Sequence, residues 1–261
     1  MNERLNNISH NDSVISQFTK QAIPFTQLSQ HSNLYGLKLM IKLSQPTNTD
    51  TVLDVACGSG IVSCEFARIV SSVIGIDLTP AMIDQAKLLQ QEKKLDNIAW
   101  EIGDVSKLPF ENDLFSLVVT RYSLHHMVEP QKIVEEMKRV CKLGGRVIII
   151  DVTPEDDKVV EYNNVEKLRD PSHVKALTIS ELENMIKMVN LSNLKFEYHE
   201  LEMNLDEILQ SSFPDPKNVS KIKQLFENDL KNNNLGMKSY LKNNKIYFYF
   251  PISMIVGNKS Y

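Results

Sequence analysis

A glycine-containing turn after a short apolar run is the part of the sequence best suited to chemistry. Val52 to Ala56 is apolar and rich in β-branched residues, and it continues into Cys57-Gly58-Ser59-Gly60 before a helical stretch. Glycines in such a turn let the backbone bend sharply and approach a ligand without a Cβ in the way. Asp77 ends the next apolar run, where a doubly wound sheet places a carboxylate beside the hydroxyls of a bound ribose. The pattern therefore predicts a site for a ribose-containing ligand.

Two classes of ligand use this geometry, and Ser63 and Asp54 distinguish them. A nicotinamide dinucleotide needs Gly-x-Gly-x-x-Gly, but Ser63 stands where the third glycine belongs. A dinucleotide also places its pyrophosphate at the helix N-terminus. Asp54, inside the first run, suits an ammonium better than an anion. The charges favour S-adenosylmethionine, which carries an ammonium and a sulfonium, over NAD(P). A glycine turn that serves only as a tight connection is the structural alternative.

The elements around this turn follow an alternating pattern of strands and helices, typical of a parallel sheet. Thr79 and Pro80 predict the N-cap and first residue of one helix, and another is expected from Gln131 to Lys142, ending at Gly144-Gly145. The five expected strands are Val52 to Ala56, Val73 to Asp77, Ile98 to Ile102, Phe115 to Thr120 and Arg146 to Val152.

The chain after Val152 loses this strict alternation. A helix-prone stretch runs to Asn190, and apolar and polar residues then alternate from Leu194 to His199, which predicts a half-exposed antiparallel strand. A second helical insert precedes the last apolar run, Ile246 to Val256. Because proline cannot donate to a sheet ladder, we expect the central strand of that run to begin only after Pro251.

Three further motifs occur in an order that narrows the assignment. They are Gly103-Asp104-Val105 after the third strand, Leu108-Pro109-Phe110 before the fourth and Gly144-Gly145 before the fifth. Together with Asp54 to Gly60 and Asp77, they resemble class I S-adenosylmethionine-dependent methyltransferases. The resemblance is greatest to the small group (methyltransferase type 11) related to ubiquinone/menaquinone C-methyltransferases. It covers about residues 14 to 200, including segments similar to group members at 121–126 (Arg-Tyr-Ser-Leu-His-His) and 169–173 (Arg-Asp-Pro-Ser-His).

The resemblance implies an α/β, Rossmann-like fold with a doubly wound, seven-stranded and mostly parallel sheet, helical lid inserts and an antiparallel last strand. Asp54 and Gly58 would hold the methionine part of the cofactor, Asp77 the ribose, and Asp104 with the Val105 amide the adenine. Ala56 stands at the family's first loop glycine, which is tolerable if it has ordinary strand angles. The residues assigned to the cofactor are Asp54, Ala56, Gly58, Gly60, Asp77, Leu78, Met82, Gly103, Asp104, Val105 and Arg121.

Methyl transfer from a sulfonium requires alignment, exclusion of water and removal of a proton from the acceptor, for which histidine is suited near neutral pH. The candidate catalytic residues are His126, His173 and Tyr122. The alternatives are structural: one histidine of the pair at 125–126 packs under the loop, and residues 169–173 form a turn. Arg121 has two further possible roles, as a partner of Asp151 or Glu166 or as a clamp for an anionic substrate.

A helical lid is expected over residues 1–50, ahead of a core over 51–261 with inserts at about 153–190 and 204–245. The chain is expected to form a single domain overall. Phe18 and Phe25 lie seven residues apart on one helical face, where they either cover the sulfonium or pack into the core. His10 and His199 are expected at the surface.

Composition favours a small-molecule substrate. Lys and Arg number 29 against 33 Asp and Glu, a net charge of −4, and no basic stripe suggests nucleic acid. No apolar run approaches the ~18 residues of a membrane span, and no residues at metal-ligand spacing suggest a metal. Three cysteines without a Cys-x-x-Cys pair favour a reducing cytoplasm.

The sequence thus predicts an S-adenosylmethionine-dependent methyltransferase that acts on a carbon, oxygen or nitrogen of a small molecule and releases S-adenosylhomocysteine. An NAD(P)-dependent oxidoreductase is one alternative, disfavoured by Ser63 and Asp54. A catalytically silent cofactor-binding partner protein is another. An RNA or protein methyltransferase is a weaker one, because the chain has no basic stripe and no appended binding domain.

Overall fold

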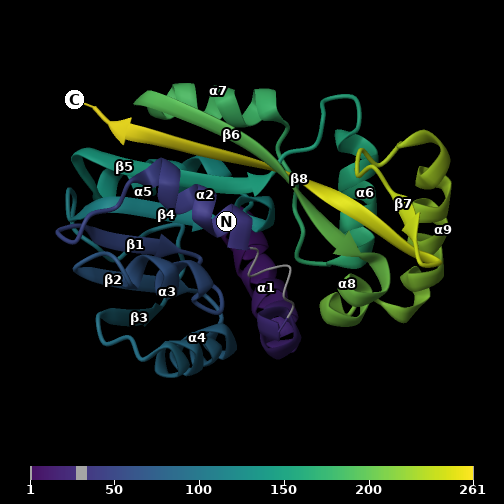
Figure 1. The fold of residues 1–261 in the computed structure, drawn as a ribbon, viewed down its shortest axis with the longest axis horizontal. Coiled ribbons are helices and arrows are strands. Elements are labelled where there is room, and N and C mark those ends of the chain that lie inside the picture. The colour runs from purple at the N-terminus through teal and green to yellow at the C-terminus, as the bar shows by residue number, and fades with distance from the viewer. Residues whose placement is uncertain (1, 28–33, 261) are drawn as a thin grey trace.

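The computed structural model describes residues 2–27 and 34–260, with the backbone alone described for residues 2–9, 25 and 27. One sheet organises the chain, in the order β3-β2-β1-β4-β5-β8-β6, with β7 paired to β8 outside this path. Strands β1 to β5 pair in parallel, and β8 is antiparallel to both β5 and β6 (Figure 1). The predicted α/β class with a mostly parallel sheet is confirmed, and the short β7 is added to it. The strands are β1 Thr51–Val55, β2 Ser72–Asp77, β3 Ile98–Ile102, β4 Phe115–Arg121, β5 Cys141–Val152, β6 Leu191–Asn204, β7 Tyr240–Lys242 and β8 Lys245–Lys259.

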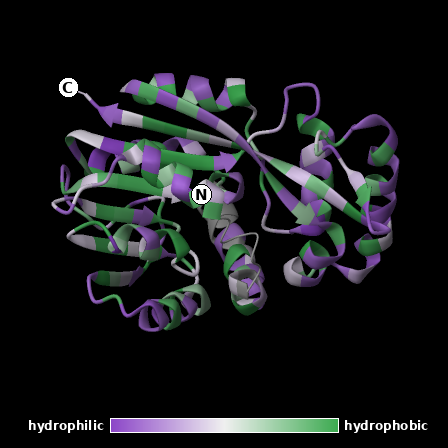
Figure 2. Cartoon of the chain, in the orientation of Figure 1, coloured by the Kyte–Doolittle hydropathy of each residue, from purple (hydrophilic) through white to green (hydrophobic). Residues whose placement is uncertain are grey.

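Helices cover both faces of this sheet. Successive residues of a strand point to opposite faces, so Val52 and Leu117 join one apolar core while Leu53 and Val118 join the other. Green apolar segments run along the central strands in Figure 2. The helices are α1 Asn2–Gln27, α2 Leu34–Ser44, α3 Ile61–Ala67, α4 Pro80–Lys93, α5 Pro130–Val140, α6 Val159–Arg169, α7 Ile179–Val189, α8 Leu205–Ser212 and α9 Pro216–Asn232, with a 3-10 turn at Leu124–His126.

Much of the two expected inserts lies in a second lobe, whereas α7, at the end of the first insert, packs against α5 on the main sheet. Strands β6 and β8 continue past the end of β5, and this extension lies among α6, α8, α9 and β7 (Figure 1). Phe248 from β8 packs there against Phe226 of α9, with 4.8 Å between ring centroids. The lobe is therefore continuous with the main sheet.

Pro251 lies inside β8, which already begins at Lys245, but the part of β8 that lies between β5 and β6 begins at Ile252, directly after the proline, as expected. Ile252 is the first residue along β8 to pair with β5, opposite Val152 at the end of β5, and the carbonyl of Pro251 accepts a hydrogen bond from the Thr153 amide. Amide and carbonyl of one residue face the same side of an antiparallel strand. The missing N–H of Pro251 therefore faces the point where β5 has already ended, and no ladder bond is lost.

One helix boundary differs from expectation, while the predicted start of α4 at Thr79 and Pro80 is confirmed. Helix α5 ends at Val140, and Cys141 and Lys142 already belong to β5. Thr79 is the N-cap of α4, but its side chain accepts no capping hydrogen bond. Its amide instead donates to Asp77 Oδ1 at 2.8 Å, so the start of this helix is hydrogen-bonded to the carboxylate that precedes it. Within the described residues, no helix is both long and apolar enough to cross a membrane.

Candidate active site

A pocket lies at the carboxyl ends of β1, β2 and β4 and is closed on one side by α1. It brings together most of the residues assigned to the cofactor, namely Asp54, Ala56, Gly58, Asp77, Leu78, Met82, Asp104, Val105 and Arg121, and it also contains Tyr122 and His126. Gly60 and Gly103 are not among its lining residues. A Cβ on Gly60 would lie 2.5 Å from Trp100, so this glycine allows close packing under the turn.

Asp77 shapes the turn as well as lining the pocket. Its Oδ2 accepts a hydrogen bond from the Gly58 amide at 2.8 Å, and its Oδ1 accepts from the Thr79 amide at 2.8 Å. The side chain is buried, and this burial raises its pKa. The carboxylate therefore joins the first glycine turn to the start of α4, and each oxygen retains a lone pair for a ligand hydroxyl.

Asp54 is the most deeply buried of the pocket carboxylates, with 1% of its surface exposed. Desolvation raises its pKa to about 7, although a 2.6 Å hydrogen bond from Ser63 Oγ opposes this effect. A buried carboxylate with so little compensation favours a cationic ligand beside it. Ser63, which replaces the third glycine of the dinucleotide motif, thus serves to hold Asp54.

Ala56 also differs from expectation, since its φ of 55° lies in the left-handed region and not among strand angles. Tyr122, at the end of β4, has the same conformation with a φ of 56°. Left-handed angles cost an L-residue ~1–2 kcal/mol. Both residues line the pocket, so this strain is located where the backbone turns toward a ligand.

We predict that Ala56→Gly stabilises the protein by about 0.5–1 kcal/mol. Glycine removes the left-handed penalty, and the greater freedom of the unfolded chain offsets ~0.4–1 kcal/mol of the gain. Urea unfolding measures the change. Ala99→Gly, at an exposed position of β3, is the control and should lose ~0.5–1 kcal/mol. If Ala56→Gly lowers the free energy of unfolding as much as Ala99→Gly does, the backbone at Ala56 is not strained.

The N-terminal helix contributes pocket residues that the sequence reasoning missed. His10 Nε2 lies 2.7 Å from the carbonyl of His126, and Asn11 Nδ2 donates to Asp104 Oδ2 at 3.0 Å. His10 is therefore not a free surface residue. The sequence did contain a pattern that could have indicated this role, because residues 10, 14 and 18 lie on one helical face. Phe18 contacts His126 edge to face at 4.9 Å, while the Phe25 side chain lies outside the described part.

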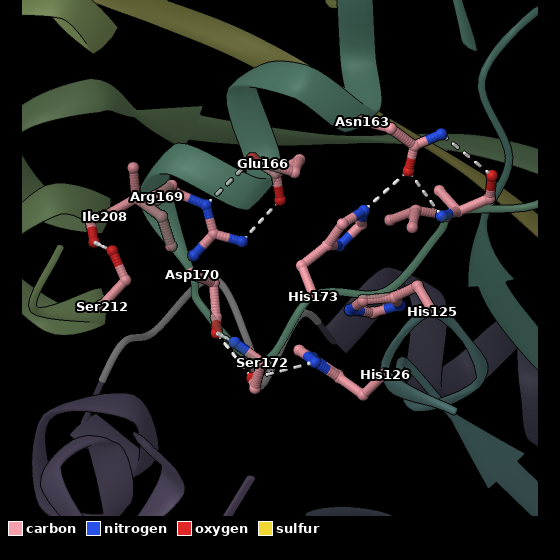
Figure 3. Close-up of polar contacts among 12 residues, drawn as sticks. His125, His126, Asn163, Glu166, Arg169, Asp170, Ser172, His173, Ile208 and Ser212 are labelled. Atoms are coloured by element: carbon pink, nitrogen blue, oxygen red, sulfur yellow. Dashed lines mark hydrogen bonds and ion pairs between the residues drawn. The ribbon is translucent and has the colours of Figure 1, made fainter. Parts of the chain in front are cut away.

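His125, His126 and His173 lie close together in Figure 3, with 4.2 to 6.3 Å between their ring centroids. His125 Nδ1 lies 2.5 Å from Asp151 Oδ1, and this carboxylate raises the pKa of His125 although burial opposes it. His173 Nε2 lies 2.7 Å from Asn163 Oδ1, and His173 is absent from the lining of either pocket described here. His126 alone of the three lines the first pocket. His199, expected at the surface, is buried.

A second pocket adjoins the first and shares Phe18, Tyr122 and His126 with it. Its other lining residues are Gln21, His125, Val152, Glu166, Arg169, Asp170, Leu201, Ile208, Phe250 and Ile252. Half of the lining is apolar or aromatic, so the second pocket can hold the apolar part of a small molecule. His126 lies at the junction of the two pockets.

The acidic residues considered as partners of Arg121 have other partners. Asp151 accepts from His125, and Glu166 forms a two-pronged pair with Arg169. The guanidinium of Arg121 lies 4.3 Å from the centre of the Tyr122 ring, and its positive charge lowers the pKa of Asp54. Among the described residues, no three His, Cys, Asp or Glu side chains are grouped to hold a metal ion.

The fold and this pocket define the class of protein. A family model described as a methyltransferase domain matches residues 46–229, and the chain belongs to that family. It is similar to the uncharacterized methyltransferase YcgJ of Bacillus subtilis, with 32% identity over 72% of this chain and 76% of the relative. The crystal structure of YcgJ superposes with a TM-score of 0.80 at 28% identity, covering 87% of this chain and 99% of that one.

Other relatives have names that state what they methylate. Demethylmenaquinone methyltransferase of Oceanobacillus iheyensis is 33% identical over 40% of this chain and 45% of the relative. A 2-phytyl-1,4-naphtoquinone methyltransferase of Synechococcus elongatus is 32% identical over 48% of this chain and 56% of the relative. The chain thus spans about half the length of these two relatives. A geranyl diphosphate methyltransferase structure with sinefungin shares the fold, with a TM-score of 0.62 at 14% identity over 86% of this chain and 78% of that one.

Proposed function

We propose that this methyltransferase takes its methyl group from S-adenosylmethionine and transfers it to a carbon, oxygen or nitrogen of a small molecule, with S-adenosylhomocysteine as co-product. The observation that carries this proposal is the first pocket, in which Asp54, Asp77 and Asp104 line one cavity around the turn at Gly58. The methyltransferase family of the chain supports the same donor.

The polar groups that line the first pocket fit S-adenosylmethionine. Buried Asp54 suits the ammonium of the methionine part, Asp77 suits the ribose hydroxyls, and Asp104 with the amide of Val105 suits the adenine edge. When bound, S-adenosylmethionine supplies a methyl group on a positively charged sulfur. The chain's own part is to orient the acceptor, exclude water and accept a proton.

We assign the second pocket to the acceptor. It meets the first at Phe18, Tyr122 and His126, and Val152, Ile208 and other apolar side chains form much of its wall. Relatives named for naphthoquinone and demethylmenaquinone methylation support a small-molecule acceptor. We further propose that residues 1–50 act as a lid, because α1 lines both pockets. The net charge of −4 supports a small molecule over nucleic acid, and the buried free cysteines suit the cytoplasm.

Calorimetric titration with S-adenosylhomocysteine and with NAD tests the donor. We expect S-adenosylhomocysteine to bind, and at a hundred times its Kd to stabilise the fold by ~2.7 kcal/mol, whereas NAD should produce neither heat nor stabilisation. Stabilisation by NAD and none by S-adenosylhomocysteine would reverse the assignment. Binding without formation of any methylated product from a panel of small acceptors would favour a silent cofactor-binding protein.

The pH dependence of binding provides a separate prediction about Asp54. Its pKa of about 7 means that the carboxylate gains its charge as pH rises, so affinity for S-adenosylhomocysteine should rise about tenfold from pH 5.5 to pH 7. The contribution of Asp54 to stability has the opposite sign. Because its folded-state pKa is raised, stability is greatest below the unfolded pKa and is lost as pH rises through about 7.

Ser63→Ala is the matched variant for this measurement. It removes the hydrogen bond that lowers the pKa of Asp54, so the rise in affinity should move to higher pH. Calorimetry across the pH series measures both proteins. An affinity that is flat over this interval, or identical curves for the two proteins, contradicts the role of Asp54.

A further inference from the structure

The hydroxyl of Ser172 connects a carboxylate to the imidazole at the junction of the pockets (Figure 3). Ser172 Oγ lies 2.6 Å from Asp170 Oδ1 and 3.1 Å from His126 Nδ1. Ser172 has no exposed surface, and Asp170 is 2% exposed. Asp170 also accepts from the Ser172 amide at 2.9 Å and from Gln21 Nε2 at 3.1 Å. The carboxylate thus accepts three hydrogen bonds, two from Ser172 and one from Gln21.

The direction of these bonds follows from the number of protons available. Although burial opposes it, the positive charge of Arg169 and the Ser172 hydrogen bonds lower the pKa of Asp170, so near pH 7 this group only accepts. The single hydroxyl proton of Ser172 is donated to Asp170, and Oγ can then only accept from His126 Nδ1. A neutral imidazole carries one N–H, so the lone pair lies on Nε2.

His126 is neutral near pH 7, because burial and the neighbouring His125 lower its pKa to about 4. Its ring is also held on the side of α1, where Phe18 meets it edge to face. The lone pair of Nε2 is therefore available at the junction of the pockets.

We infer that Asp170 and Ser172 are positioning residues that hold His126 in its Nδ1–H form, so that Nε2 takes the proton from an uncharged acceptor in the second pocket. This inference rests on the proposed function, which supplies the methyl group. The proton leaves the reacting atom of the acceptor for Nε2. The electron pair left on that atom forms the bond to the methyl carbon, and the former methyl–sulfur pair stays on sulfur.

The charged groups around the second pocket favour an uncharged acceptor. Arg169 is paired with Glu166, and His125 is paired with Asp151. The other carboxylate that lines this pocket, Asp170, accepts its hydrogen bonds within the described part of the chain from Ser172 and Gln21, and from no lysine or arginine. An anionic acceptor would meet paired cations and an additional carboxylate. An apolar molecule whose reacting atom bears a dissociable proton suits both the walls and Nε2.

Nitrogen NMR of the histidine rings tests the tautomer without any turnover. The chain has six histidines, and the His126→Gln spectrum identifies the signals of His126 by their loss. In the parent protein at pH 7 we expect a proton on Nδ1 and a bare Nε2. A proton on Nε2 in the parent overturns the inference, whatever the variants do.

Ser172→Ala removes the hydroxyl, and we expect it to shift the tautomer ratio of His126 toward Nε2–H by about fivefold, the equivalent of one hydrogen bond. Ser44→Ala is the matched control, since Ser44 is equally buried and its Oγ donates to the Met40 carbonyl in α2. Ser44→Ala should leave the ratio unchanged. An unchanged ratio in Ser172→Ala overturns the role of Ser172.

The acceptor class is tested with phenol and benzoate as probes on the protein loaded with S-adenosylhomocysteine. Phenol should shift the Nε2 signal of His126, and benzoate at equal concentration should not. A shift with benzoate alone, or with neither probe, overturns the uncharged acceptor. If S-adenosylhomocysteine fails to bind while the tautomer is as expected, the proposed function fails and the hydrogen-bond chain stands. If S-adenosylhomocysteine binds but His126 carries its proton on Nε2, the proposed function stands and the inference about Asp170 and Ser172 fails.

Discussion

Replacement of Asp77 by alanine is expected to weaken S-adenosylhomocysteine binding at least about a hundredfold, or ~2.7 kcal/mol. Two losses combine in this variant. The proposed partner of the ribose hydroxyls disappears, and the amides of Gly58 and Thr79 lose the carboxylate that now holds each of them at 2.8 Å. A hydrogen bond to a charged group contributes ~1.5–3 kcal/mol, so the loss of one ligand contact and of turn geometry accounts for this magnitude.

Calorimetry measures the affinity, and Asp84→Ala provides the control. Asp84 is an exposed aspartate of the neighbouring helix α4, so its removal changes the net charge equally and leaves the pocket intact. Asp84→Ala should bind like the parent. If Asp77→Ala binds within threefold of the parent and remains folded by circular dichroism, the first pocket is not the site of the adenosyl group.

The parts of the fold that sequence analysis predicted are those determined by local pattern. The β-branched runs at β1, β2 and β4 are almost wholly buried, and their positions follow directly from apolar periodicity. Asp54 and Asp77 were found because an acidic residue within or at the end of such a run has few structural uses. Their roles toward a ligand stay predictions, while their presence in one pocket is a feature of the structure.

The parts that were missed depend on contacts distant in the chain. The start of β8 at Lys245 was missed, because a strand can include Pro251 only where β5 has ended beside it, and this depends on the register of two strands. The angles of Ala56 follow from the sharp turn toward the pocket and not from its side chain. His10 reaches the His126 carbonyl across more than a hundred residues. The helical face that His10 shares with residues 14 and 18 could be read from the sequence, but the partner that this face meets could not.

His173 shows why residue type alone does not identify a catalytic group. It belongs to the same segment as Ser172, yet its ring turns toward Asn163 of α6, whose side-chain oxygen also accepts from the Ala176 amide. Ser172, which the sequence analysis considered only as part of a turn at residues 169–173, contacts His126. Two adjacent residues of the turn that follows α6 thus have different partners, His126 for Ser172 and Asn163 for His173.

Breaking the buried pair between Glu166 and Arg169 is expected to cost the most stability of any change described here. Arg169→Ala should lower the free energy of unfolding by ~3–5 kcal/mol, because it leaves Glu166 charged and buried without a partner. The two side chains are 4% and 11% exposed, and Arg169 donates through both Nε and Nη2. Against a total stability of ~5–15 kcal/mol, this loss should be evident as a large fall in the urea midpoint.

Arg68→Ala is the matched control, since Arg68 faces Glu65 at the same three-residue spacing but is 53% exposed and 3.8 Å away. Exposed pairs contribute ~0–1 kcal/mol, so this variant should stay close to the parent. Replacing both partners together, as Glu166→Leu with Arg169→Met, should recover most of the loss, because no buried charge is then left alone. Equal effects of Arg169→Ala and Arg68→Ala, or a double variant as unstable as Arg169→Ala, would show that burial of an unpaired Glu166 is not what destabilises the wall of the second pocket.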